Sequence, residues 1–110
     1  MVLVFGMAAC ANTPPPTEQL AAARVMVNQA QPVAAKEAPL ELQAALVKLG
    51  RAEDAMQQGN YEIARRDAEQ AEVDARLAWT IAERARAQRA EAEVERGIEA
   101  LRQEIGRRGR

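Results

Sequence analysis

Histidine and serine are both absent from this 110-residue chain, and its one cysteine is Cys10. The side-chain hydroxyls are limited to Thr13, Thr17, Thr80 and Tyr61. Without histidine and serine no Ser-His-Asp triad can be assembled, and zinc or Glu-x-x-His di-iron sites lack their usual ligands. The carboxylates lie among many arginines, where solvated ion pairs are the common outcome. We therefore expect no enzyme, no cofactor and no metal site.

Aromatic residues make up 3% of the chain, and alanine dominates its 48% hydrophobic fraction. A large apolar core is therefore not available. Fifteen basic and sixteen acidic residues are interspersed, whereas nucleic-acid binding needs a basic face. No stretch approaches the roughly 20 apolar residues of a membrane-spanning helix. These absences predict one small domain with no nucleic-acid partner and no small-molecule substrate.

The first ten residues carry no charge and end at Cys10, directly before a Pro-rich segment. An apolar run followed by small residues is typical of a secretory signal, so residues 1–9 are predicted to be a signal peptide. Met7-Ala8-Ala9-Cys10 resembles the lipobox of bacterial lipoproteins, which implies cleavage before Cys10 and acylation of its sulfur. Cys10 is thus the predicted lipid-attachment residue, and an ordinary unpaired cysteine near the terminus is the competing interpretation. The resemblance further implies the outer membrane of a Gram-negative cell, because Ala11 follows the cysteine instead of Asp.

Prolines and glycines divide the remaining chain. Residues 10–16 are predicted to form the lipidated end and a stiff Pro-rich tether. Thr17 is expected to cap a short helix over about 17–31, and Pro39 suits the first turn of a second helix over about 40–58. Gly59-Asn60 is a strong turn signal, with glycine ending one helix and asparagine capping the next. A third helix over about 61–105 completes an all-α domain over 17–105, with 106–110 as a basic tail.

The third helix carries alanines at steps of three and four residues, a pattern typical of a helix-packing seam. Its positions are 64, 68, 71, 75, 78, 82 and 85. We expect the second and third helices to form an antiparallel hairpin along it, with Leu42, Leu46, Leu49 and Met56 inside. Trp79 should lie opposite Leu40 and cover that end of the hairpin.

A second apolar stripe needs cover from elsewhere. It consists of Val94, Ile98, Leu101 and Ile105, with Val73, Leu77 and Ile81 also off the seam. Two interpretations remain open: the first helix folds back over these residues, or the long helix self-associates as a parallel or antiparallel coiled coil.

Two resemblances follow from longer segments. Gly59-Asn60-Tyr61, flanked by spaced alanines, resembles the hinge of a tetratricopeptide helix pair, although a stable array needs about three such units. With Thr17-Glu-Gln-Leu20 and the segment 68–75 included, residues 8–90 resemble small Gram-negative lipoproteins with an alanine-rich helical domain of unknown function. That resemblance implies a helical fold and a place in the cell envelope, but no activity.

Three roles remain. The first is a lipid-anchored structural or interaction protein at the periplasmic face of the outer membrane, partnered by itself or by an envelope protein. The second is a non-covalent tether to peptidoglycan or lipopolysaccharide through Arg84, Arg86, Arg89 and residues 107–110, because guanidinium groups suit phosphate and carboxylate. The third is a single-hairpin, tetratricopeptide-like adaptor that holds an apolar helix against the Val94 to Ile105 stripe.

Overall fold

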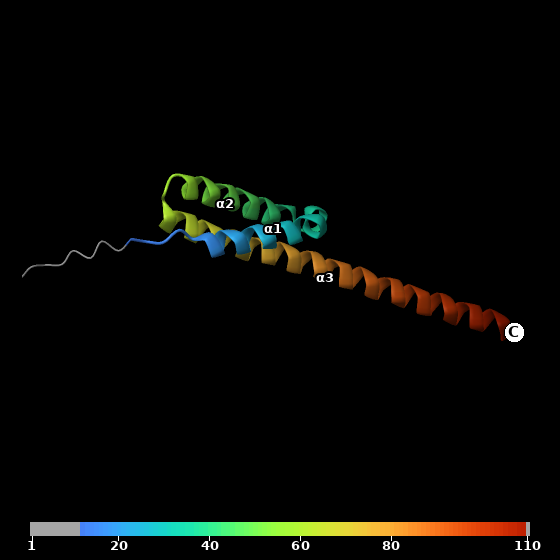
Figure 1. The fold of residues 1–110 in the computed structure, drawn as a ribbon. Coiled ribbons are helices and arrows are strands. Elements are labelled where there is room, and N and C mark those ends of the chain that lie inside the picture. Colours follow the sequence, from blue (N-terminus) through green and yellow to red (C-terminus); the bar gives the residue numbers. More distant parts are fainter. Residues whose placement is uncertain (1–11, 110) are drawn as a thin grey trace, which may run out of the picture.

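The computed structural model describes residues 12–109, which fold into three helices with no strand in that range. These are α1 (Thr17–Glu37), α2 (Pro39–Gln57) and α3 (Tyr61–Arg108). Figure 1 shows α1 and α2 beside the first half of α3, while the second half of α3 projects alone. We call residues 16–89 the head and residues 90–108 the arm. The predicted signal peptide and Cys10 lie outside the described residues.

The all-α class and the long last helix are confirmed. The finer arrangement differs from the expected one in the role of α1, which packs along α3 as extensively as α2 does. Glu37, the last residue of α1, forms an ion pair with Arg89 of α3. From α2, Lys48 pairs with Asp74 at 2.6 Å and Arg51 pairs with Asp67 at 3.4 Å. The later residue of α2 therefore contacts the earlier residue of α3.

Helix α1 is longer than the predicted 17–31, because it continues through Pro32 to Glu37. Its buried positions keep one spacing on both sides of that proline: Leu20, Ala23, Val27, Ala30 and Ala34. Packing of this face outweighs the loss of one backbone hydrogen bond at Pro32. The predicted Thr17 cap is wrong, since Pro16 takes the cap position and the Thr17 hydroxyl lies 3.4 Å from the Pro15 carbonyl oxygen.

The start of α2 confirms the sequence prediction. Pro39 occupies its first turn, where the missing N–H is not needed. Ala38 alone separates the two helices, and its N–H donates to the Ala34 carbonyl at 2.8 Å. The buried Ala38 side chain makes this junction part of the core.

The turn after α2 is a Schellman motif built on Gly59. The Asn60 N–H donates to the Ala55 carbonyl at 2.9 Å and the Gly59 N–H to the Met56 carbonyl at 3.2 Å. Gly59 has φ +78°, the left-handed conformation that the sequence predicted. Asn60 stands at the cap position of α3, but its side chain makes no cap hydrogen bond and instead donates to the Gln58 side chain at 3.4 Å.

Two glycines give a matched pair of opposite predictions. Gly59→Ala forces a Cβ into the left-handed region and should destabilise the protein by about 1–2 kcal/mol. Gly50→Ala lies inside α2 with open space around its Cβ and should stabilise by about 1 kcal/mol. Chemical denaturation of both variants measures the difference, and equal effects of the same sign would contradict the Gly59 conformation.

The core is made mainly of alanine. Six predicted seam positions have no exposed surface, namely Ala64, Ala68, Ala71, Ala75, Ala78 and Ala82, whereas Ala85 is only half-buried. Ala75, Ala78 and Ala82 pack with Val27 and Leu42, while Ala68 and Ala71 pack with Leu20. Such small side chains let all three helix axes approach closely. Both α1 and α2 therefore pack against the alanine seam of α3.

The expected packing of Trp79 on Leu40 is wrong. Trp79 is 41% exposed and Leu40 is 80% exposed. The inward position in the first turns of α2 belongs to Leu42, and Trp79 lies at the edge of the α3 seam, about 40° around the helix from the buried Ala75 and about 100° from Ala78. Leu46, Leu49 and Met56 are partly buried against the core.

Candidate functional site

The arm is a helix with no packing partner among the described residues. From Arg86 to the end of α3 the side chains are exposed except for a half-buried Glu104. At 1.5 Å per residue, α3 is about 72 Å long, and the arm makes up its last 19 residues or about 28 Å. Helix α3 also runs to Arg108, beyond the predicted end at 105, so Gly106, Arg107 and Arg108 of the expected tail are helical. The arm thus presents helical surface on all sides.

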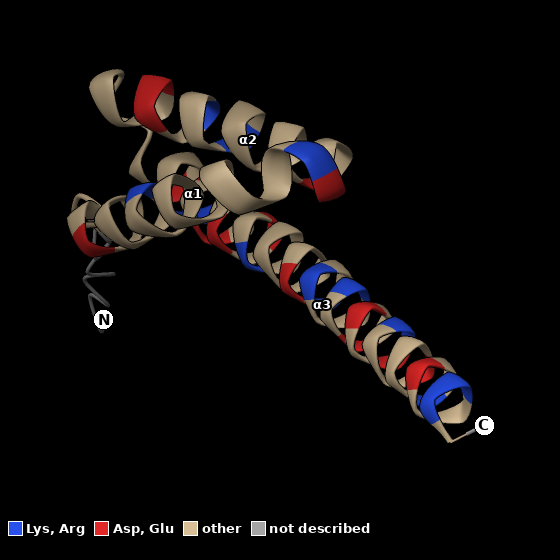
Figure 2. Cartoon of the chain, turned by 90° about the vertical axis from the view of Figure 1, so that its right-hand side faces the viewer, with Lys and Arg blue, Asp and Glu red and all other residues tan. Residues whose placement is uncertain are grey.

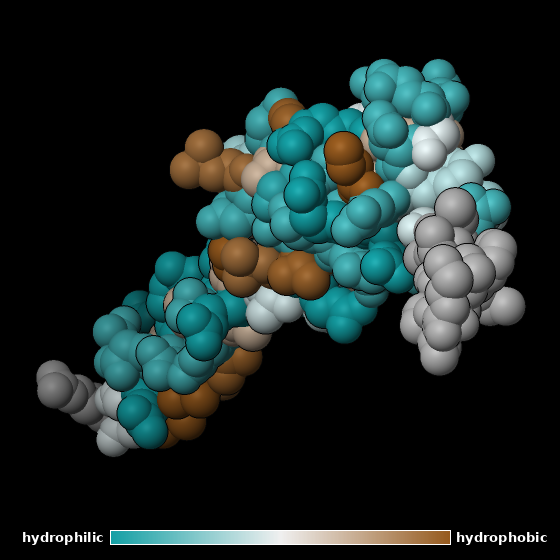
Figure 3. Space-filling view, turned by 90° about the vertical axis from the view of Figure 1, so that its left-hand side faces the viewer, coloured by the Kyte–Doolittle hydropathy of each residue, from teal (hydrophilic) through white to brown (hydrophobic). Residues whose placement is uncertain are grey.

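One side of the arm is apolar. We call its four residues the arm stripe, and they are 61%, 43%, 64% and 69% exposed: Val94, Ile98, Leu101 and Ile105. Hydrophobic atoms run along one edge of the projecting arm in Figure 3. Exposed apolar surface arranged in a continuous row is typical of an interaction site.

The arm stripe faces away from the head. At 100° per residue, its four positions span about 60° of the helix and centre about 130° from the alanine seam. Helix α1 lies on the seam and ends beside Arg89, so it does not cover the stripe. The fold-back interpretation is therefore wrong for the stripe and for Val73 and Leu77, which are 65% and 49% exposed. Ile81 does pack against the core.

The arginines proposed for anion binding are mostly paired within the chain. Arg86 meets Glu83 at 2.9 Å, and Arg89 meets Glu37. Arg107 and Arg108 both meet Glu104, at 2.8 and 3.3 Å. Arg84 makes no ion pair within residues 12–109. Figure 2 shows basic and acidic residues interspersed along α3.

One buried acidic group was missed by the sequence analysis. Asp67 lies on α3 with 2% of its side chain exposed, between Arg51 at 3.4 Å and Arg66 at 3.5 Å. Its Oδ2 atom makes no hydrogen bond. The signal was present in the sequence, because Asp67 stands three residues after Ala64 and so shares its face. Both arginines are more than half exposed, which makes this an ion-pair contact within the head.

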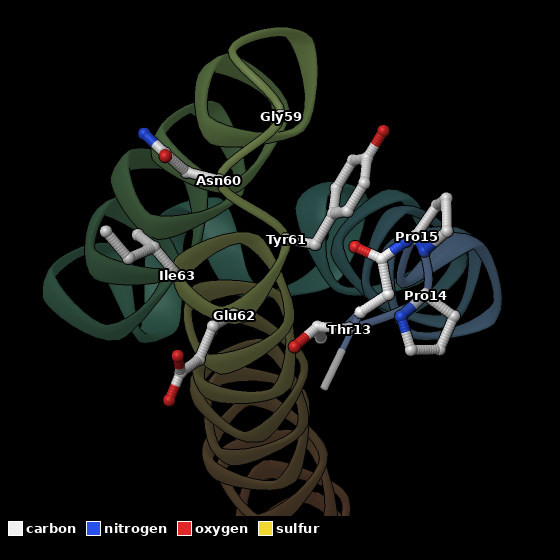
Figure 4. Close-up of a pocket in the computed structure, with 9 residues that line it drawn as sticks. Thr13, Pro14, Pro15, Gly59, Asn60, Tyr61, Glu62 and Ile63 are labelled. Atoms are coloured by element: carbon white, nitrogen blue, oxygen red, sulfur yellow. The ribbon is translucent and has the colours of Figure 1, made fainter. Parts of the chain in front are cut away.

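The start of α1 lies against the turn between α2 and α3. Figure 4 shows Thr13, Pro14 and Pro15 on one side of a shallow recess, with Tyr61 and Glu62 on the other. The recess is wide open and holds no group of three metal-ligating side chains, nor does any other part of residues 12–109. The recess matters because of where it lies. It places the segment that follows Cys10 at the start of α3, which is the opposite end of that helix from the arm.

Neither a lipid site nor a membrane span can be located in the described part of the chain. Cys10, the predicted attachment residue, lies outside it. None of the helices in residues 12–109 combines the length and apolar character that crossing a bilayer requires.

Comparison with known proteins places the chain in a family. A family model described as a domain of unknown function, DUF4398, matches residues 18–95. This range covers all of α1 after its first residue, all of α2, and α3 up to the first part of the arm. No curated protein and no solved structure matched the chain. The chain therefore belongs to the DUF4398 family of domains of unknown function.

Proposed function

We propose that this protein is a lipid-anchored component of the Gram-negative cell envelope, with a structural or protein-interaction role at the periplasmic face of the outer membrane. The observation that carries the interaction role is the arm stripe, four exposed apolar residues on a helix without a partner in the described chain. The head buries the alanine seam, whereas the arm stripe stays in solvent. This arrangement exposes an apolar contact surface on the projecting arm.

The position of the two ends supports this role. Pro14 and Pro15 lie beside Tyr61 at the start of α3, whereas the arm is the end of the same helix. An anchor at Cys10 would therefore be separated from the arm tip by about 70 Å of helix. Attachment at one end and recognition at the other would not interfere with each other.

Other roles receive less support from the same residues. A tether to peptidoglycan or lipopolysaccharide needs available guanidinium groups, but Arg86, Arg89, Arg107 and Arg108 already face carboxylates. An adaptor that holds an apolar helix against the Val94 to Ile105 stripe would use the arm itself and is one form of the interaction role, whereas a groove between α2 and α3 is not free because α1 packs on both helices. The arm stripe, by contrast, is an apolar surface that no described residue covers.

The anchor is tested by labelling cells with radioactive palmitate. The wild-type chain and Thr13→Ala should both incorporate label and fractionate with the outer membrane, because Thr13 follows the predicted attachment residue without taking part in acylation. Cys10→Ala should lose all label, since the diacylglyceryl group of a lipoprotein is attached to that sulfur and acylation of the new N-terminus takes place only after that step. Equal labelling of Cys10→Ala, or no labelling of any variant, would contradict the anchor.

A further inference from the structure

We propose that the arm binds a second copy of this chain in antiparallel orientation, through a two-stranded coiled coil over residues 91–108. This inference rests on the proposed interaction role and names its partner. It is carried by three independent features of the arm: the spacing of its apolar residues, the order of its charges, and the direction in which its stripe faces.

The arm stripe is symmetric under reversal. Its spacings are four, three and four residues, the a and d positions of a heptad repeat. When two arms run in opposite directions about a point between Glu99 and Ala100, Val94 of one copy meets Ile105 of the other. In the same register Ile98 meets Leu101. Every apolar residue of the stripe therefore gains an apolar partner.

The charges beside the stripe select the antiparallel direction. In this register Glu91 lies opposite Arg108 of the second copy, and Glu95 and Arg102 both take e positions of the heptad, so across the two copies they neighbour each other along one edge of the seam. Each pairing occurs twice by symmetry. A parallel, in-register pair would instead place Glu91 against Glu91 and Arg108 against Arg108, and like charges at the seam disfavour that arrangement.

The groups that these pairs need are available. Glu91, Glu95 and Arg102 form no ion pair within residues 12–109, and Arg108 is 83% exposed in its contact with Glu104. A shallow recess on the arm is lined by Glu95, Ile98 and Arg102 together. The two complementary charges thus flank an apolar residue on one side of the helix, as the edge of a coiled-coil seam requires.

The head leaves room for the second copy. The stripe is turned about 130° from the seam that α1 and α2 cover. The register places Arg108 of the second copy beside Glu91, just beyond the last head contact at Arg89. The two heads then sit at opposite ends of the paired arms. The starts of the two α3 helices would be about 115 Å apart, so the dimer would lie along one bilayer or join two surfaces.

The charge balance of the arm argues against an anionic membrane as its occupant. Residues 90–108 hold five acidic groups, Glu91, Glu93, Glu95, Glu99 and Glu104, and four basic groups, Arg96, Arg102, Arg107 and Arg108, for a net charge of −1. Helices that lie on anionic lipid are rich in Lys and Arg on their polar face. A second arm supplies both signs of charge at matching places.

A charge-swap experiment tests the orientation. Sedimentation equilibrium would be run on the full chain carrying Cys10→Ala, with circular dichroism as the check that each variant is folded. Glu95→Arg alone and Arg102→Glu alone should each weaken dimerisation about tenfold or more, because each puts like charges beside one another. The double variant should return to within about threefold of the parent. Glu93→Arg, on the outer face, is the control and should leave dimerisation unchanged.

A disulfide experiment tests the register independently. Val94→Cys and Ile105→Cys chains, both in the Cys10→Ala background, would be mixed and oxidised. The antiparallel register predicts mainly the mixed disulfide between positions 94 and 105. Mainly homodisulfides at 94 would show a parallel pair and would overturn the proposal.

A chain that stays monomeric at about 100 μM, or a double variant without rescue, would also overturn this inference. The proposed function would survive that result if the arm cross-links to a different protein in cells. The absence of both a dimer and any such protein would remove the interaction role as well.

Discussion

Leu42→Ala should lower the free energy of unfolding by about 2–5 kcal/mol, the usual range for a leucine truncated in a core. Leu42 is 7% exposed and packs against Val27 and the alanines of the seam. In a core built from alanine it is one of the few large buried side chains, so its removal leaves a cavity that neighbouring small residues cannot fill. For a domain of this size each kcal/mol lowers Tm by roughly 4–8 °C.

Leu40→Ala is the matched control for this experiment. Leu40 lies two residues earlier in the same helix and is 80% exposed, so the free energy of unfolding should change by no more than about 0.5 kcal/mol. Thermal and urea denaturation measure both variants. Similar losses from Leu40→Ala and Leu42→Ala would contradict the orientation of α2.

Ala75→Asp should destabilise the protein by about 3–5 kcal/mol, because it places a carboxylate without a partner in the core. Ala75 has no exposed surface and packs in the same cluster as Val27 and Leu42. Asp67 shows how this helix accommodates a buried carboxylate, namely with Arg51 and Arg66 beside it. Position 75 faces apolar neighbours instead, and the aspartate side chain is too short to reach solvent.

Ala87→Asp separates the burial effect from helix propensity. Ala87 is an exposed residue of the same helix, so the substitution should cost less than about 1 kcal/mol, the difference in propensity between the two residues. Urea denaturation followed by circular dichroism compares the two variants. A loss at position 87 that equals the loss at position 75 would show that the seam is not the packed surface.

The periodicity of the sequence predicted much of the head. Alanines at steps of three and four residues identified the buried face of α3, and six of the seven predicted positions have no exposed surface. Gly59 was identified because its place after a helical pattern calls for a left-handed conformation, and its φ is +78°. Local chemistry of this kind is encoded by single residues and their neighbours, so it can be read without tertiary structure.

The errors arose where tertiary contacts outweigh local preference. Pro32 suggested the end of α1, but the buried face extends to Ala34 and Ala38 and holds the helix together. Trp79 was placed over Leu40 by counting outward from the turn, but Trp79 stands at the edge of the seam and Leu40 points into solvent. Asp67 was overlooked because an acidic residue is expected in solvent, and only the fold brings Arg51 of α2 to it.

The arm stripe shows a different limit of sequence analysis. Its 4-3-4 spacing identified an apolar row that needs cover, but the sequence left open whether α1 or another molecule supplies it. The packing of α1 on the alanine seam removes the first possibility for the described residues. Acylation of Cys10 stays a prediction, since that residue lies outside the described part of the chain.

Photo-cross-linking in living cells tests most directly the claim that the arm stripe is a protein-binding surface. A benzophenone amino acid would replace Leu101 in one full-length chain and Gln103 in another; the two positions are both exposed and about 160° apart around the helix. A protein-binding stripe should give protein adducts from position 101, whether with a second copy or another envelope protein, and few or none from position 103. Equal adduct yields from the two positions, or none from position 101, would contradict it.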